Sequence, residues 1–105
     1  MPTTASRVIE LSPGRMRALI RWVHAQKIER STEKTALVIL AANSVRIDGE
    51  YRSYTTLDTL NARCSMAIAG RCVKKLQERG LIERRRGPHP DTGRPCNYYV
   101  MCADL

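Results

Sequence analysis

The sequence predicts a mainly α-helical fold with a small β-hairpin, an α+β class, on three observations. Apolar residues recur at helical spacing in several segments before residue 80. The last of these segments ends in Gly80-Leu81-Ile82, which is typical of a helix terminus. Two strand-like runs then follow, separated by a loop rich in Gly and Pro. A length of 105 residues with 43% hydrophobic content indicates one domain rather than two.

The N-terminal part divides into an arm and a helix. Residues 1–11 lack periodicity and are interpreted as a flexible N-terminal arm, which leaves a single domain over 12–105. Ser12 and Pro13 suit the cap and first turn of a helix over 12–28. Its apolar stripe faces either its own core or a second copy of the chain in a homodimer, and consists of Met16, Leu19, Ile20, Trp22 and Val23.

The other side of this helix is basic. It carries Arg15, Arg17, Arg21, His24 and Lys27, and no acidic residue occurs between Leu11 and Ile28. This side is either a second phosphate-facing surface or a solvated helix face, and the second interpretation is favoured because charge runs are usually solvated.

A core helix is expected over 31–43. Ser31 or Thr32 is expected to cap it, and Glu33 lies in its positive first turn. The helix is apolar on most sides, which is typical of a central position. The following residues, 45–54, are interpreted as a polar connection with a turn at Asp48-Gly49, and residues 51–55 give only a weak indication of a strand.

Two further helices are expected over 56–63 and 65–79. Thr55 or Thr56 caps the first, with Leu57 and Leu60 on its buried face, and Ser65 caps the second. The inward face of the second helix is formed by Ala69, Cys72, Val73 and Leu76.

A β-hairpin over 81–102 follows the second of these helices. If Gly80 takes a left-handed conformation, Leu76 and Leu81 stand at the two positions that touch in a Schellman ending. The chain then enters a strand with three consecutive arginines, a loop that Gly and Pro exclude from the strands, and a returning strand.

This order of elements resembles the winged helix-turn-helix DNA-binding proteins, of the bacterial and phage type found in transcription regulators and replication proteins. The resemblance rests on 57–60, the turn, 69–76, Gly80-Leu81-Ile82 and the basic hairpin, and it covers about 31–101. The turn departs from the family pattern because it lacks the usual Gly and is about two residues short, which leaves the start of the recognition helix between Ser65 and Ala67.

The resemblance implies that the 65–79 helix enters the major groove and that the hairpin is a basic wing. The expected base-reading residues are Arg71, Lys74, Ala67 and Gly70, and Arg71 is favoured because its fork matches the two acceptors of guanine. The expected phosphate and wing contacts are Thr55, Thr56, Arg63, Ser65, Lys75, Arg84, Arg85, Arg86 and Arg94.

Charge supports a polyanionic partner. Eighteen Lys and Arg oppose ten Asp and Glu, for a net charge of +8. We therefore expect a double-stranded DNA-binding protein, a sequence-specific transcription regulator of phage or plasmid type. The alternatives are a replication-initiation protein and a winged-helix interaction module that docks an acidic partner.

Other function classes find little support in the sequence. The two histidines and scattered acids do not form a catalytic pattern, so no enzyme, cofactor or metal site is expected. The cysteines lack CxxC spacing and are interpreted as reduced thiols, with a disulfide or zinc site involving Cys96 and Cys102 as the alternative. The sequence has no apolar run of membrane-spanning length, and a cytoplasmic location without membrane contact is expected.

Overall fold

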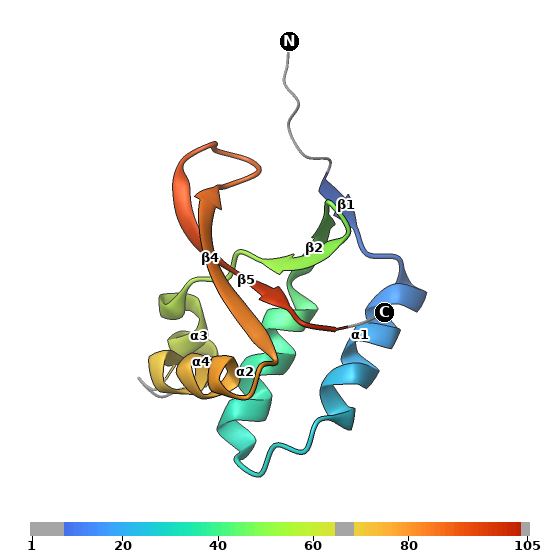
Figure 1. The fold of residues 1–105 in the computed structure, drawn as a ribbon, viewed down its shortest axis with the longest axis vertical. Helices are drawn as coiled ribbons and strands as arrows, with labels where there is room; N and C mark the ends of the chain where they lie inside the picture. Colours follow the sequence, from blue (N-terminus) through green and yellow to red (C-terminus); the bar gives the residue numbers. More distant parts are fainter. Residues whose placement is uncertain (1–7, 65–68, 104–105) are drawn as a thin grey trace.

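The chain folds into helices packed against an antiparallel sheet (Figure 1). The structure, a computed structural model, describes residues 8–64 and 69–103. Within them the sheet has five strands in the order β1-β2-β3-β5-β4. The elements are β1 (Val8–Glu10), α1 (Pro13–Ala25), α2 (Ser31–Ala42), β2 (Ser44–Ile47), β3 (Glu50–Ser53), α3 (Leu57–Cys64), α4 (Ala69–Glu78), β4 (Ile82–Pro88) and β5 (Pro95–Met101). The predicted α+β class is confirmed.

The main core lies between the helices and one face of the sheet. Helix α2 occupies its centre, with Leu37 and Leu40 fully buried, and it contacts α1, α3, α4 and β3. Helix α4 adds Leu76, and the sheet adds Tyr99 and Met101 from β5. Replacing a leucine such as Leu37 with alanine here would cost about 2–5 kcal/mol, because the cavity would be surrounded by packed elements.

Helix α1 begins as predicted and ends earlier. The Ser12 hydroxyl accepts a hydrogen bond from the Arg15 amide at 3.2 Å, and Pro13 opens the helix. The helix stops at Ala25 rather than near residue 28. Leu19 and Val23 are fully buried in the chain's own core, and the neighbouring Ile20 and Trp22 pack against that core. These four residues of the apolar stripe are therefore used within the domain, and the homodimer contact stays a prediction.

Three local predictions were wrong. Helix α2 is capped by Arg30 without a side-chain hydrogen bond, rather than by Ser31 or Thr32. Leu57 is 37% exposed, because α3 begins at this residue and the first turn projects from the core, whereas Leu60 is buried as predicted. The predicted arm over 1–11 is not uniformly loose, because Val8–Glu10 form β1 and pair with β2.

The segment predicted as a polar connection over 45–54 is instead a β-hairpin. Asp48 and Gly49 have φ values of 51° and 80°, and Ile47 pairs with Glu50 across them, as in a tight two-residue hairpin turn. The second strand, β3, also pairs with β5. These strands could not be predicted from the sequence because Arg46, Glu50 and Arg52 make the segment as polar as a loop. The pairing of β3 with the distant β5 stabilises them.

The second face of the sheet is also partly buried. Ile47, Tyr98 and Val100 are at most 7% exposed, although they lie outside the main core cluster. Neighbouring residues along a strand point to opposite faces, so Tyr98 and Val100 occupy the face opposite Tyr99 and Met101. Strand β5 lies between β3 and β4, and it is covered on both sides.

Candidate nucleic-acid interface

The α3 and α4 helices are joined by a side-chain cap. The Asn61 carbonyl oxygen on α3 accepts a hydrogen bond from the Ala69 amide at the start of α4, at 2.8 Å. This bond fixes one end of α4 relative to α3 although residues 65–68 are not described. The predicted site residues Ser65 and Ala67 lie outside the described residues, as does the predicted start of this helix.

The exit from α4 has the predicted Schellman geometry. Gly80 has a φ of 74°, and its amide donates to the Gln77 carbonyl at 2.9 Å. The Leu81 amide donates to the Leu76 carbonyl at 3.1 Å. These two bonds turn the chain directly from α4 into β4. Helix α4 and the hairpin are thereby connected without a flexible linker.

A buried carboxylate also holds the end of α4. Glu33 on α2 is 4% exposed, and its Oε1 atom lies 3.4 Å from Nε of Arg79, just after α4. Its Oε2 atom lies 3.9 Å from Nε of Arg30. The two guanidinium groups offset only part of the cost of burying this charge, because Oε1 is buried without a hydrogen-bond partner among the described residues. The arrangement places the C-terminal end of α4 against the start of α2.

The outward face of α4 is basic and open. Ala69, Cys72, Val73 and Leu76 are buried as predicted, while Gly70, Arg71 and Lys74 are exposed. Arg71 and Lys74 form no hydrogen bond or ion pair with the described residues. Lys75 differs, because its ammonium group lies 3.5 Å from the Glu78 carboxylate. That pair is exposed on both sides, so it restrains Lys75 only weakly.

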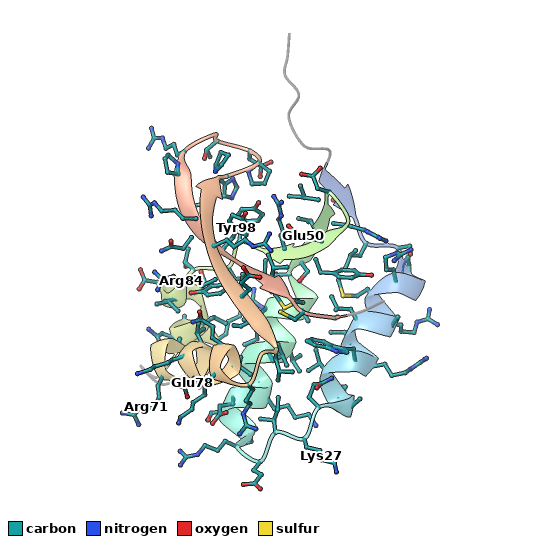
Figure 2. The ribbon with its side chains drawn as sticks, in the orientation of Figure 1. Lys27, Glu50, Arg71, Glu78, Arg84 and Tyr98 are labelled. Carbon is teal, nitrogen blue, oxygen red and sulfur yellow. The ribbon has the colours of Figure 1, made fainter. Side chains whose placement is uncertain are left out.

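The three arginines of β4 divide between the two faces of the hairpin. Arg84 and Arg86 share one face, with Tyr99 and Asn97 as their cross-strand partners. Both are exposed and have no ion pair among the described residues. In Figure 2, Arg84 and Arg71 point to the same side of the molecule, the side where α3 and α4 lie. The exposed Arg63 at the end of α3 and Arg94 at the hairpin loop also lack described ion pairs.

Arg85 lies on the opposite face and is neutralised there. One of its nitrogens lies 2.5 Å from the Glu50 carboxylate of β3, and another lies 3.2 Å from that of Glu83. Burial opposes ionisation of Glu50, but hydrogen bonds from Arg85 and Arg52 outweigh it, so the pKa of Glu50 is lowered. Hydrogen bonds to Glu83 and Glu50 raise the pKa of Arg85. The arrangement favours a structural role for Arg85 over the phosphate contact expected from the sequence.

An aromatic cluster covers the same face as Arg85. The Tyr54 ring lies 5.0 Å from that of Tyr98 and 5.2 Å from that of His89 in the hairpin loop. The Arg52 guanidinium lies 5.1 Å from the centre of the Tyr98 ring. Nδ1 of His89 accepts a hydrogen bond from the Asp91 amide at 3.0 Å, which folds the loop back on itself. These contacts brace the hairpin against β3.

A hollow of about 380 Å³ separates the start of α3 from the hairpin. Its lining includes Thr55, Thr56, Asp58, Arg84 and Asn97, together with His89, Tyr54 and Tyr99. The Thr56 hydroxyl accepts from the Thr59 amide at 3.1 Å, which confirms it as a cap of α3, and the Thr55 hydroxyl lies 3.0 Å from that of Ser53. Arg84, the hydroxyls and the free amides of the first turn can together bind an anion, with Asp58 as the one acidic group in the lining.

Several residues that shape this region were not found from the sequence. Asn61 was missed because its partner is eight residues away across a turn. Glu83 had a visible signal, since it shares strand parity with Arg85, but Glu50 lies 35 residues from Arg85 and had none. Asn97 was missed because its role depends on the register of β4 with β5.

The described residues also bear on metal sites, cysteine chemistry and membrane-spanning helices. Among the described residues, no three His, Cys, Asp or Glu side chains gather in a way that could hold a metal ion. Cys96 is half-buried and Cys102 exposed, both as thiols, and burial together with Glu83 raises the pKa of Cys102. No helix within 8–64 and 69–103 combines the length and apolar content needed to cross a bilayer. Comparison of the chain with protein family models, curated proteins and solved structures found no match.

Proposed function

We propose that this protein is a winged-helix protein that binds double-stranded DNA and acts as a sequence-specific transcription regulator of phage or plasmid type. The observation that carries the proposal is the distribution of cations without described ion pairs. Arg71 and Lys74 on α4, and Arg84 and Arg86 on the hairpin, are exposed, while Arg85 and Arg52 on the other face are neutralised by Glu50. A surface selected only for solubility would not require this division.

In the proposed complex, α4 lies in the major groove and Arg71 reads a guanine. Arg71 is favoured over Lys74 because a guanidinium donates two parallel hydrogen bonds to the O6 and N7 acceptors. Gly70 supports a close approach, since a methyl group added there would meet nothing within 4 Å in the protein. The groove wall could then lie against the α4 backbone at this position.

The wing supplies the backbone contacts. Arg84 and Arg86, with Arg94 at the loop, would bind phosphates or enter a narrow minor groove beside the α4 site. The hollow beside Arg84 accepts one phosphate at the start of α3, where Thr55 and Thr56 lie. The Schellman ending connects α4 to β4 directly, so groove and backbone contacts have a fixed relative position.

Selection of binding sites from random duplex DNA tests the proposal. We expect an enriched site containing a guanine, and about six phosphate contacts would give a log-log salt slope near −5. Arg71→Ala should cost about 1–3 kcal/mol and relax selection at that guanine alone.

Two outcomes would contradict the proposal. Failure to bind duplex DNA at about 50 mM salt would exclude it, because the electrostatic term is strong under that condition. Unchanged function of an Arg71→Ala, Arg84→Ala double variant would instead favour docking of an acidic protein on another surface.

A further inference from the structure

A second basic surface lies on α1, away from the proposed DNA interface. Its first part is the row Arg17, Arg21 and His24, which are all exposed and spaced four and three residues apart. Such positions lie on one side of a helix, with a rise of about 6 Å and then about 4.5 Å along its axis. Leu19 and Val23 fix the opposite side of α1 in the core, so the row points away from the protein.

This row is not neutralised by the protein. Arg17 and Arg21 form no ion pair or hydrogen bond with the described residues, and α1 contains no acidic residue. Two other basic residues near α1 do have partners: Arg15 donates to the Tyr51 hydroxyl at 3.0 Å, and Arg30 lies beside Glu33. The exposed acids nearest to α1 in sequence are Glu10, just before the helix, and Glu29, on the connection to α2.

Helix α2 extends the surface with groups that suit phosphate. His24 lines a hollow of about 260 Å³ together with Lys34, Ser31, Thr35 and Val38 of α2. Ser31 does not cap α2, and neither its hydroxyl nor that of Thr35 has a hydrogen-bond partner among the described residues. Two basic residues and two hydroxyl residues therefore surround one shallow hollow, whose exposed lining is itself mostly apolar, and His24 connects it to the row on α1. We use the name α1–α2 surface for the row on α1 and the polar residues of the hollow on α2, which are Arg17, Arg21, His24, Ser31, Lys34 and Thr35.

Helix α1, which carries Arg17, Arg21 and His24, lies on the opposite side of the molecule from the proposed interface. Figure 1 shows α3 and α4 on one side and α1 on the other, and in Figure 2 Lys27, just past α1, points away from Arg71 and Arg84. The domain measures only 47 × 29 × 21 Å. A duplex has a persistence length of about 50 nm, and even a bend of 40–90° within one site costs about 1–6 kcal/mol. One bound segment would have to bend further to reach both sides.

We propose that the α1–α2 surface binds the phosphate backbone of a second DNA duplex, so that one protein molecule bridges two segments. This inference rests on the proposed function for its first contact. The second contact is made to phosphates, since the guanidinium groups of α1 and the hydroxyls of α2 can donate to phosphate oxygens whatever the base sequence. Its affinity falls steeply with salt.

A capture assay tests the bridge. A short duplex carrying the selected site is fixed to beads and saturated with full-length protein, and retention of a labelled second duplex is measured against salt. The test variant is Arg17→Gln with Arg21→Gln, and the charge-conserving control is Arg17→Lys with Arg21→Lys. We expect the Gln variant to bind the first duplex within about twofold of wild type, to capture at least about tenfold less of the second, and to lower the capture salt slope by about 2.

The outcomes separate the two proposals. Failure of wild type to bind the first duplex contradicts the proposed function. Two results would overturn the bridge and leave the proposed function intact. One is normal binding of the first duplex without capture of the second. The other is equal capture by wild type and the Gln variant, which is expected if a dimer binds the two duplexes through two identical interfaces. Loss of affinity of the Gln variant for a single long duplex, again without capture, would show wrapping and would also overturn it. Unchanged far-UV circular dichroism and melting temperature verify that the variants are folded.

Discussion

The two faces of the β4–β5 hairpin carry the same residue type in different electrical environments. Arg84 and Arg86 are exposed on the face toward α3 and have no described ion pair, whereas Arg85 between them is bound by Glu50 and Glu83. We call the face that carries Arg84 and Arg86 the inner face and the one that carries Arg85 the outer face. The outer face is also covered by Tyr54, Tyr98 and His89. A run of identical charges along a strand can therefore perform two tasks, because alternate side chains meet different neighbours.

The comparison also explains why the hairpin can present its arginines rigidly. The outer face provides ion pairs, ring contacts and burial that tie β4 and β5 to β3. The inner face is then free to keep its charges unneutralised, at a cost in repulsion that the outer face offsets. A hairpin that neutralised all three arginines would be more stable, but it would present fewer unpaired cations to a polyanion.

The largest expected effect comes from matched substitutions at adjacent positions. Arg84→Gln and Arg85→Gln each remove one charge, so a purely global charge effect would weaken DNA binding equally. We expect Arg84→Gln to weaken binding roughly tenfold and to reduce the salt slope by about 0.9, with little change in stability. Arg85→Gln should change affinity less than about threefold but lower stability by about 1 kcal/mol.

Fluorescence anisotropy at several salt concentrations and thermal melts measure these two effects. Equal losses of affinity would break the distinction between the faces, since they would mean that Arg85 leaves its carboxylates to contact DNA.

A second prediction concerns Glu50 and pH. The lowered pKa of Glu50 means that its ion pairs stabilise the folded state above its usual pKa of 4.5 and that this contribution is lost as the pH falls through the lowered value. Glu50→Gln should therefore cost about 1 kcal/mol at neutral pH, and the difference from wild type should shrink in acid. Urea unfolding at a series of pH values provides the measurement.

The control for Glu50 is Asp48→Asn, whose carboxylate is 60% exposed and lies 3.8 Å from Arg52. That change should have a small effect at every pH, as surface pairs do. A cost of Glu50→Gln that stayed constant into acid would contradict the assignment.

The smallest effects come from two glycines. A methyl group at Gly87, on the outer face, would lie 3.3 Å from the buried Tyr98 ring, so Gly87→Ala should cost up to about 1 kcal/mol. A methyl group at Gly70 on α4 would meet nothing, so Gly70→Ala should add about 0.5–1 kcal/mol through higher helix propensity. Thermal melts show whether each substitution lowers or raises stability. DNA titration should show weaker binding only for Gly70→Ala, because its added methyl group would stand where the DNA groove approaches α4.

Much of the helical part could be predicted because its determinants are local. Ser12 and Pro13 fixed the start of α1, and the Leu76, Gly80 and Leu81 spacing fixed the exit from α4. The buried face of α4 followed from apolar spacing alone. The hairpin over 81–102 followed from two strand runs and a Gly/Pro loop. In each case the signal lies within a few residues, where helix and turn geometry decide which side chains meet.

The sheet beyond the hairpin and the roles of its charges were decided only by the tertiary structure. Strands β1, β2 and β3 are short and carry charged residues, and β3 pairs with β5, which lies about fifty residues further along the chain. In sequence, Arg85 differs from Arg84 only in sharing strand parity with Glu83, and the second carboxylate that neutralises it, Glu50, is distant along the chain and adjacent in space. The sequence by itself determined where α1 begins, how the chain leaves α4 and where basic residues gather. The folded sheet decided which of those charges remain unpaired, because ion pairing depends on distances in space that local spacing does not specify.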